Sequence, residues 1–246
     1  MARRRFFVDH IRNGKAELFG EEAYHLTRVL RVQVEQQFEL SDNQSVYLAE
    51  VREAHKDKVS FAILEQLPLR PDPVDLTLLV SLIKFDRFEW ILEKSVELGV
   101  TRFVPVMAER SEKGLEQGAQ KRMERWRRIL RESSEQSRRD RLPEILEPVS
   151  FGETLGRAGA LRFFLDEAER ARPILDHIPE PGLRQASDTV LLLTGPEGGW
   201  VDAERDRAVA RGWLPVTLGP RILRAETAAM AAVSVLVIAW SQSQRS

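Results

Sequence analysis

A cluster of three prolines divides the chain into two regions whose apolar residues follow different patterns. Pro68, Pro71 and Pro73 lie within six residues, and proline restricts its own backbone as well as that of the residue before it. We therefore expect a semi-rigid linker with a domain boundary near residue 71. The length of 246 residues suits a small domain at residues 1–70 followed by a larger one at residues 71–246.

The region before the prolines has the pattern of short strands. Stretches that mix β-branched or aromatic residues with polar ones are separated by turn-forming residues, and residues 20–31 have the apolar spacing of a helix. Several short strands with one helix indicate a small β-barrel. The expected strands cover residues 5–8, 37–41, 45–51 and 58–64.

After the prolines, apolar strands alternate with helices, which is typical of an α/β domain with a mostly parallel sheet. Strands are expected at residues 74–83, 103–107, 161–165, 189–193 and 214–218. Helices are expected at residues 85–98 with Gly99 as C-terminal cap, at 121–136, at 202–211 with Asp202 as N-cap, and at 225–240. The last helix is apolar on almost every face, so we expect it to be buried within a core or between subunits.

Composition excludes several kinds of site. The chain has no cysteine, which rules out disulfides and thiolate ligands, and its four histidines lack the spacing of metal ligands, so we expect no metal. Charged residues closely follow the basic N-terminus, which argues against a secretory signal. The longest apolar stretch is shorter than the roughly 20 residues that span a bilayer. We therefore expect a cytoplasmic protein without a membrane segment.

Residues 191–199, Leu-Leu-Leu-Thr-Gly-Pro-Glu-Gly-Gly, join a buried strand to a helix through a glycine-rich loop. In open α/β sheets, ligands bind beyond the carboxyl ends of the strands. The loop lacks the glycine spacing of dinucleotide-binding folds and the lysine of a P-loop, and Glu197 would repel phosphate. It therefore suits a ligand without phosphates, although alone it fits a plain strand-to-helix turn equally well.

Residues 218–228, Leu-Gly-Pro-Arg-Ile-Leu-Arg-Ala-Glu-Thr-Ala, make a second junction of this kind. They place two arginines, Arg221 and Arg224, together with Glu226 and Thr227, where a parallel sheet would bind a ligand. The alternative is that the arginines are solvated and that Glu226 and Thr227 cap the last helix.

Together these two segments resemble the knot region of the SPOUT methyltransferases, and among them the RsmE-type 16S rRNA uridine N3-methyltransferases. Shorter matches at residues 5–8, 25–31, 84–87, 97–99, 109–111 and 135–137 extend the resemblance over both domains. The chain departs from the usual pattern at three places: Ala225 replaces a threonine, Trp200-Val201 replaces Phe-Ser, and Arg138 replaces a common glycine.

The resemblance implies an α/β fold in which a PUA-like β-barrel precedes a SPOUT trefoil-knot domain. It also implies a homodimer that uses S-adenosyl-L-methionine to methylate N3 of a uridine near the decoding site, in the 3′ region of 16S rRNA, on the assembled 30S subunit. The implied cofactor-binding residues are Leu165, Leu193, Thr194, Gly195, Pro196, Glu197, Gly198, Gly199, Leu218, Gly219, Arg221, Ile222, Leu223, Thr227 and Ala228.

Methylation at uracil N3 requires removal of the proton that N3 carries, or stabilisation of the resulting anion. We expect Arg224 to stabilise negative charge on the uracil oxygens, and Glu197 or Glu226 to accept the proton. For Glu226, helix capping is an equally good interpretation.

RNA binding must depend on local basic patches, because the formal net charge is −1. Residues 121–141 contain nine basic and four acidic residues, and the arginines of the barrel could form a second patch. A solvated surface remains the alternative for each single charge. The candidate RNA contacts are Arg3, Arg4, Arg5, Arg28, Arg31, Arg110, Glu135, Gln136, Arg138 and Arg139.

Three other functions remain open at this point. A related SPOUT enzyme could methylate a different RNA site, such as a ribose 2′-hydroxyl. A PUA-type RNA-binding or ribosome-assembly factor would use the knot loops only as structure. A small-molecule enzyme with another nucleotide is disfavoured by the missing phosphate-binding motifs.

Overall fold

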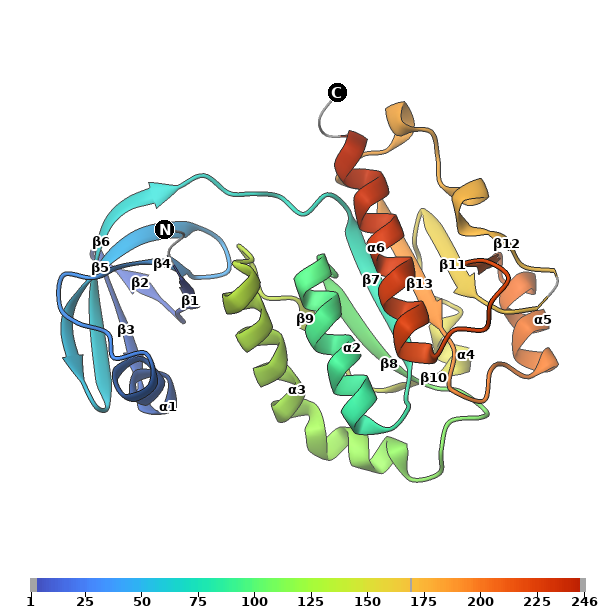
Figure 1. Ribbon diagram of the computed structural model, residues 1–246, viewed down its shortest axis with the longest axis horizontal. Helices are drawn as coiled ribbons and strands as arrows, with labels where there is room; N and C mark the ends of the chain where they lie inside the picture. The colour runs from blue at the N-terminus through green and yellow to red at the C-terminus, as the bar shows by residue number, and fades with distance from the viewer. Residues whose placement is uncertain (1–3, 169, 244–246) are drawn as a thin grey trace. The chain divides into compact units, whose positions relative to one another are not determined.

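The computed structural model describes residues 4–168 and 170–243 (Figure 1). Contacts between backbone segments divide the chain into two units. The N-terminal unit comprises Met1–Pro71 together with Ser134–Leu142, and the C-terminal unit comprises Asp72–Ser133 together with Pro143–Ser246. The N-terminal unit is therefore built from two separate stretches of chain, and the proline-rich linker marks only the first of its boundaries.

The N-terminal unit is a six-stranded mixed sheet in the order β1-β4-β5-β6-β3-β2 (Figure 1). The strands β1 and β4 pair in parallel, and the other neighbours pair antiparallel. Phe6, Leu18, Leu26, Leu40 and Phe61 belong to its apolar core. The strands are β1 (Arg5–Phe7), β2 (Ile11–Arg12), β3 (Lys15–Phe19), β4 (Gln37–Ser41), β5 (Val46–His55) and β6 (Lys58–Leu67), and α1 (Gly20–Tyr24) continues into the π-helical turn η1 (His25–Val29).

The second stretch of the N-terminal unit is attached to the first by hydrogen bonds that involve loops and strand ends. The Ser41 hydroxyl donates to the Asp140 carbonyl at 2.6 Å, and the Leu142 amide donates to Asn43 Oδ1 at 2.8 Å. Since Ser41 ends β4 and Asn43 lies in the turn after it, residues 134–142 hold that corner of the sheet in place.

The C-terminal unit contains an eight-stranded sheet in the order β10-β8-β7-β13-β11-β14-β12, with β9 pairing with β8. Each of these pairings is parallel, as the alternation of strands and helices predicts. The strands are β7 (Asp75–Ser81), β8 (Arg102–Met107), β9 (Glu144–Ile145), β10 (Val149–Ser150), β11 (Leu161–Leu165), β12 (Arg172–Pro173), β13 (Thr189–Thr194) and β14 (Leu214–Thr217).

Helices cover both faces of this sheet. The residues Phe88, Trp126 and Leu236, from α2, α3 and α6, pack with one face, whereas Phe151 and Ala208, from α4 and α5, pack with the other. Because both faces are covered, the central strands are continuous apolar runs. The helices are α2 (Phe85–Leu98), α3 (Leu115–Ser137), α4 (Phe151–Thr154), α5 (Asp202–Ala210) and α6 (Ala225–Ser243), with 3-10 turns η2 (Ile174–His177) and η3 (Pro181–Leu183).

The two helix caps predicted from sequence have different outcomes. Gly99 follows α2 with a φ of 109°, a left-handed conformation that glycine adopts without strain, and this confirms it as the C-terminal cap. The prediction of Asp202 as an N-cap is wrong, because Asp202 is already the first helical residue and the extended Val201 precedes it. The Val201 amide instead donates to Glu204 Oε2 at 3.2 Å.

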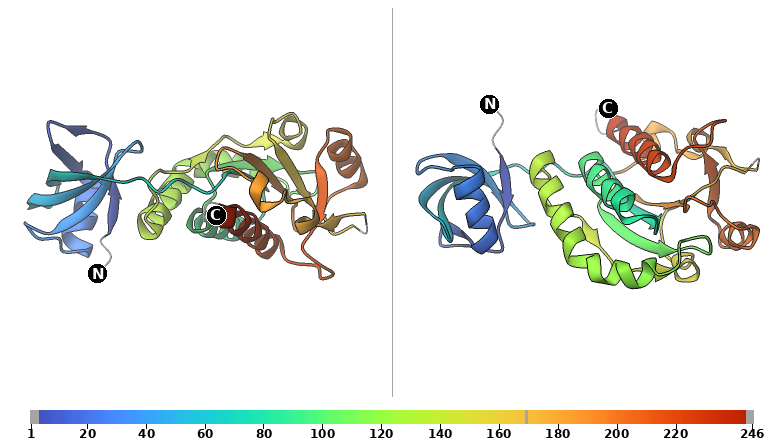
Figure 2. Two further views of the ribbon diagram at one scale, coloured as in Figure 1. Left: turned by 90° about the horizontal axis from the view of Figure 1, so that it is seen from above. Right: turned by 60° about the horizontal axis from the view of Figure 1, so that its bottom comes forward.

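The helix α6 lies beside α2 on the sheet, as two views show (Figures 1 and 2). By length and composition alone it could cross a membrane, but core helices of soluble proteins meet this criterion too. It buries Ala229, Ala232 and Leu236 against the sheet and leaves Ile238 58% exposed. An apolar residue is thus exposed away from the face that packs in the core.

Candidate functional site

A pocket of about 400 Å³ opens at the carboxyl ends of three neighbouring strands, β13, β11 and β14. Loops that follow parallel strands converge at this edge, which is where such sheets bind ligands. The loop after β13 leads to α5, and the loop after β14 leads to α6 (Figure 1). The pocket is lined by Arg87, Leu165, Asp166, Glu167, Thr194, Gly195, Pro196, Glu197, Gly198, Gly199, Trp200, Thr217, Leu218, Arg221, Ile222, Leu223, Arg224, Ala225 and Ala228.

Most of the expected cofactor residues belong to this lining, but four of the expected site residues do not. Leu193 lies in the core, with its side chain among the residues that α5 covers, and Gly219 and Thr227 are exposed outside the lining. Glu226 is 8% exposed, and its Oε2 has no hydrogen-bond partner among the described residues. The carboxyl group of Glu226 therefore does not reach the pocket surface in this structure.

Trp200 anchors the glycine-rich loop beneath the pocket. Its indole Nε1 donates to the carbonyl of Leu165 at 2.9 Å, and its ring stacks on Phe164 with 4.7 Å between centroids. A Cβ on Gly195 would lie 2.9 Å from that same Nε1, closer than side chains tolerate. Gly195 is therefore required because the tryptophan occupies the space where a side chain would lie.

The hydroxyl of Thr194, at the end of β13, is buried and has no hydrogen-bond partner among the described residues. Thr194 also lines the pocket. Buried polar atoms without partners are costly, so such an atom at a pocket wall is typical of a site that receives a polar ligand.

The far end of the same loop is held by two further contacts. Arg110 donates from Nη1 to the carbonyl of Gly198 at 2.8 Å. Gly199 has a φ of 67°, and a Cβ there would lie 2.8 Å from Glu167 Oε1. The loop can therefore approach Glu167 closely only with glycine at this position. Arg110, expected as an RNA contact, is exposed and also shapes the pocket loop.

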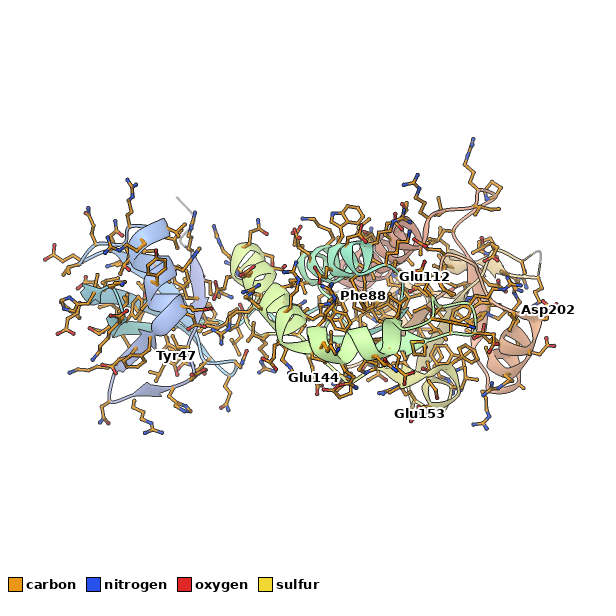
Figure 3. The ribbon with its side chains drawn as sticks, turned by 90° about the horizontal axis from the view of Figure 1, so that it is seen from below. Tyr47, Phe88, Glu112, Glu144, Glu153 and Asp202 are labelled. Carbon is orange, nitrogen blue, oxygen red and sulfur yellow. The ribbon has the colours of Figure 1, made fainter. Side chains whose placement is uncertain are left out.

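Three carboxylates beside β11 and α5 share the guanidinium of Arg205. Its Nε lies 3.1 and 3.2 Å from the two oxygens of Asp166, its Nη2 lies 3.0 Å from Glu167 Oε1, and its Nη1 lies 3.1 Å from Asp202 Oδ1. Burial disfavours the charged form of Arg205, but hydrogen bonding and attraction to Asp166 outweigh it and raise the pKa. Asp202 is exposed at the start of α5, as Figure 3 shows.

The loop after β14 carries a different charge. Arg221 and Arg224 both line the pocket and are exposed, and within the described part of the chain neither has a carboxylate at ion-pair distance. Ile222 between them is 87% exposed. Two free cations and an exposed apolar side chain are what a loop that contacts an anionic partner would present.

Arg87, in the first turn of α2, is a pocket residue that the sequence analysis did not assign to the site. It forms an ion pair with Glu197, the carboxylate of the glycine-rich loop. The signal was its place in the short match at residues 84–87, in the first turn of the helix that follows a buried strand. The pairing means that a candidate proton acceptor is held by a cation from a different segment.

The expected RNA-binding arginines of the N-terminal unit lie in two environments. Arg4, Arg28 and Arg31 are exposed, and Arg4 also lines a separate pocket of about 500 Å³. Arg5 is only 4% exposed and forms ion pairs with Glu39 and Asp140. Its charge is therefore balanced within the unit and is not available to RNA. Arg3 lies outside the described residues.

The remaining RNA candidates belong to the second stretch of the N-terminal unit. Gln136 is exposed, and Arg139 is half-buried. Glu135 Oε1 accepts a long hydrogen bond of 3.4 Å from a backbone amide of β1. The carbonyl of Arg138 accepts from Arg5, and Arg138 has a φ of 57°, which a glycine would adopt without strain.

Several arginines of α3 form ion pairs within the C-terminal unit, so fewer of them are available to RNA than the sequence suggests. Arg122 and Arg125 both bind Glu89 of α2, at 3.1 and 2.8 Å. Arg127 lies beside two glutamates of the C-terminal unit. The net positive charge of residues 121–141 is thus partly balanced within the fold, and the exposed Arg4, Arg28 and Arg31 are better placed to bind an anionic partner.

Comparison with known proteins gives consistent results over both units. Residues 70–237 match the family model of an RNA methyltransferase domain, and residues 19–64 match that of an RNA methyltransferase PUA domain. The chain is 37% identical to the ribosomal RNA small subunit methyltransferase E of Synechocystis sp., over 87% of this chain and 69% of that protein. It is 33% identical to the protein of the same name in Bacillus subtilis, over 88% and 87%.

Solved structures give the same result. The methyltransferase E of Neisseria gonorrhoeae, bound to S-adenosyl methionine, superimposes with a TM-score of 0.86 at 30% identity, covering 97% of this chain and 98% of that one. A putative methyltransferase from Legionella pneumophila, in complex with the same cofactor, superimposes with a TM-score of 0.87 at 30% identity and equal coverage.

Proposed function

The chain belongs to the ribosomal RNA small subunit methyltransferase E family, and from this membership we propose that it methylates N3 of a uridine in 16S rRNA. The proposed methyl donor is S-adenosyl-L-methionine. The proposed target lies near the decoding site, in the 3′ region of the RNA, and the substrate is the assembled 30S subunit. This function implies a cytoplasmic protein.

The pocket of the C-terminal unit has the properties that such a cofactor needs. Its volume of about 400 Å³ lies within the usual range for small-molecule sites. Thr194 offers a buried hydroxyl without a hydrogen-bond partner among the described residues, and the glycine at position 195 lets the loop pack against the Trp200 ring at the pocket wall. Two relatives of about 30% identity bind S-adenosylmethionine, which supports the same ligand here.

The observation that carries the proposal is the distribution of charge around the pocket. Each lining carboxylate has an arginine partner, whereas Arg221 and Arg224 have no carboxylate at ion-pair distance within the described residues. The two guanidiniums are therefore available to an incoming anion. RNA supplies such charge in its phosphates and, once N3 is deprotonated, in the uracil ring.

The chemistry assigned to these residues follows from what N3 lacks. S-adenosylmethionine, when bound, supplies an electrophilic methyl group. The N3 atom becomes nucleophilic only when its proton leaves, and the negative charge then spreads over the uracil oxygens. Arg224 stabilises that charge, and Glu197, held by Arg87, accepts the proton. Glu226 is the less suitable acceptor, because its carboxyl group lies outside the pocket lining.

The N-terminal unit is proposed to bind the RNA. Arg4, Arg28 and Arg31 are exposed, and within the described part of the chain no ion-pair partner balances them. Such charges contact phosphates and make binding dependent on salt. Arg5 is not part of this surface, because its guanidinium is buried in two ion pairs.

The protein is also proposed to act as a homodimer. Ile238 of α6 and Trp90 of α2 are 58% and 43% exposed, and these two helices lie side by side on the sheet (Figure 2). A second copy of the chain would cover these apolar side chains, as in obligate interfaces. Sedimentation should show a dimer, and Ile238→Glu should shift it towards monomer.

The decisive test is a methylation assay with the purified chain, labelled cofactor and either 30S subunits or naked 16S rRNA. Methyl transfer with 30S subunits, and 3-methyluridine in the digested RNA by mass spectrometry, is the expected result. A 2′-O-methyl product would show a related enzyme with a different target. Absence of S-adenosylhomocysteine binding by calorimetry would instead show an RNA-binding factor without this activity.

A further inference from the structure

The pocket of the C-terminal unit has walls of different charge. The end of β11 contributes Asp166 and Glu167, whereas the loop after β14 contributes Arg221 and Arg224. The arginines suit the anionic substrate of the proposed function. The carboxylates suit a positive charge, and the only cation needed in that reaction is the methyl donor itself.

The acidic wall has more negative charge than its arginine can balance. Three carboxylates, those of Asp166, Glu167 and Asp202, contact the single guanidinium of Arg205. The side chain of Asp166 is fully buried, whereas that of Asp202 is 94% exposed to solvent and does not line the pocket. Glu167 differs from both, since it lines the pocket with a side chain that is 49% exposed.

The position of Glu167 is maintained by two neighbours. Its Oε1 lies 3.0 Å from Arg205 Nη2, and the same oxygen lies against Gly199, where a Cβ would come within 2.8 Å. Its Oε1 makes the closest approach to both neighbours, and Oε2 has no hydrogen-bond or ion-pair partner within the described part of the chain, which leaves Oε2 to face solvent or a ligand. Thr194 independently marks the pocket as built for a ligand, because its buried hydroxyl lines the wall without a partner among the described residues.

We propose that Glu167 makes the pocket prefer the methyl donor, with its positive sulfonium, to the product, whose sulfur is neutral. The inference rests on the proposed function. In that reaction the bond from sulfur to the methyl carbon breaks, the bond from N3 to that carbon forms, and the N3 proton passes to the acceptor. The sulfur thereby loses its positive charge, while the amino-acid tail and the adenosine are the same before and after.

A carboxylate on the wall therefore distinguishes substrate from product by charge alone. At the effective dielectric of a partly open pocket, one such carboxylate in the wall is worth roughly a three- to tenfold difference in affinity. Its attraction ends when the methyl group has left, which favours release of S-adenosylhomocysteine. Glu167 is thus a specificity-determining residue for the cofactor and takes no part in moving the proton.

The test is calorimetry on the full chain with three ligands: S-adenosylmethionine, S-adenosylhomocysteine and sinefungin, which carries an ammonium where the sulfonium would be. Glu167→Gln keeps the size of the side chain and removes its charge. We expect it to weaken the two cationic ligands roughly three- to tenfold while changing the affinity for S-adenosylhomocysteine less than about twofold.

Asp202→Asn is the matched control, because it removes another carboxylate from the same arginine at a position outside the pocket lining. It should leave the ratio of affinities unchanged. An equal loss for all three ligands, an unchanged ratio in Glu167→Gln, or an equal effect of Asp202→Asn would overturn the proposal. Failure of the unmodified chain to bind any of the three would overturn the proposed function as well, so the two failures are distinguishable.

Discussion

The indole nitrogen of Trp200 donates a hydrogen bond of 2.9 Å to the carbonyl oxygen of Leu165. This bond joins the loop after β13 to the end of the neighbouring strand β11, so two walls of the pocket are fixed to each other. Phenylalanine, which the resemblance noted in the sequence leads one to expect at this position, could not donate such a bond.

Replacing Trp200 with phenylalanine should remove this tie and keep most of the aromatic packing. We expect the free energy of unfolding to fall by about 1 kcal/mol, with cofactor affinity reduced but not lost. Urea unfolding and calorimetry with S-adenosylhomocysteine measure the two effects. Trp213→Phe removes a longer bond of 3.4 Å to Leu155, away from the pocket, and should leave the affinity unchanged. Complete loss of binding in Trp200→Phe would contradict this account.

The helix α5 begins without a side-chain cap, because its N-cap is Val201. Val201→Thr conserves the shape of the side chain and adds a hydroxyl that can accept a hydrogen bond from the first turn. We expect stabilisation of about 0.5–1 kcal/mol in thermal or urea unfolding. Val201→Ala has the smaller side chain without the hydroxyl, so it should not stabilise. A Thr variant no more stable than the Ala variant would show that Glu204 already satisfies this helix start.

Arg224→Ala should separate catalysis from cofactor binding. If Arg224 stabilises the uracil anion, turnover should fall by roughly 10²-fold or more while the affinity for S-adenosylhomocysteine stays the same. Single-turnover methylation of 30S subunits and calorimetry provide the two measurements. Arg211→Ala removes the same charge from an exposed position after α5 and serves as control. Full turnover in Arg224→Ala would exclude the proposed role.

Arg5→Ala should destabilise the N-terminal unit rather than act on RNA directly. The guanidinium side chain is 5% exposed, and its removal leaves Glu39 and Asp140 without their cation in a poorly hydrated position. Breaking a buried pair of this kind costs about 3 kcal/mol. Thermal unfolding should show the loss, whereas the exposed Arg28→Ala should change stability by less than about 0.5 kcal/mol and weaken RNA binding. Equal stabilities would contradict the prediction.

The ion pairs of Glu89 predict that the free energy of unfolding falls at acid pH. Burial raises the pKa of this carboxyl group, but hydrogen bonds and charges of Arg125 and Arg122 outweigh burial and lower the pKa below its ordinary 4.5. The folded state therefore gains stability above pH 4.5, and this gain disappears as the pH falls through the lowered pKa. Glu89→Gln should narrow the difference in unfolding free energy between pH 7 and about pH 3. Parallel pH curves for the two proteins would refute it.

The architecture was largely predictable from hydrophobic pattern. Continuous apolar runs identified the central strands of the C-terminal unit, and the resemblance supplied the fold class, which the relatives confirm as a SPOUT-type α/β domain behind a PUA-like unit. The strand at Lys15–Phe19 was missed although Ala16 and Leu18 alternate with charged residues. Two-residue strands such as β9 and β12 are too short to show any period.

The site was predictable only where strand ends coincide with the two motifs. Asp166 and Glu167 were missed because they follow a strand without a glycine-rich or otherwise distinctive segment, whereas Arg87 lies in a short match to the family to which no role was assigned. The burial of Arg5 could not be predicted from the sequence, because its ion-pair partner Asp140 lies far along the chain. Arg138 has a left-handed backbone that favours glycine, at a position where the resemblance leads one to expect glycine.

The two-part composition of the N-terminal unit sets an order of events during synthesis. Its six strands leave the ribosome first, but Arg5 and Ser41 can meet Asp140 only after α2, β8 and all of α3 have been translated. The first unit to emerge is thus completed late, by residues that follow the whole first stretch of the other unit, Asp72–Ser133. A fragment cut at the proline-rich linker would lack the second stretch of the N-terminal unit, which holds one corner of its sheet. The N-terminal unit can therefore complete its structure only when the chain has been translated beyond that stretch.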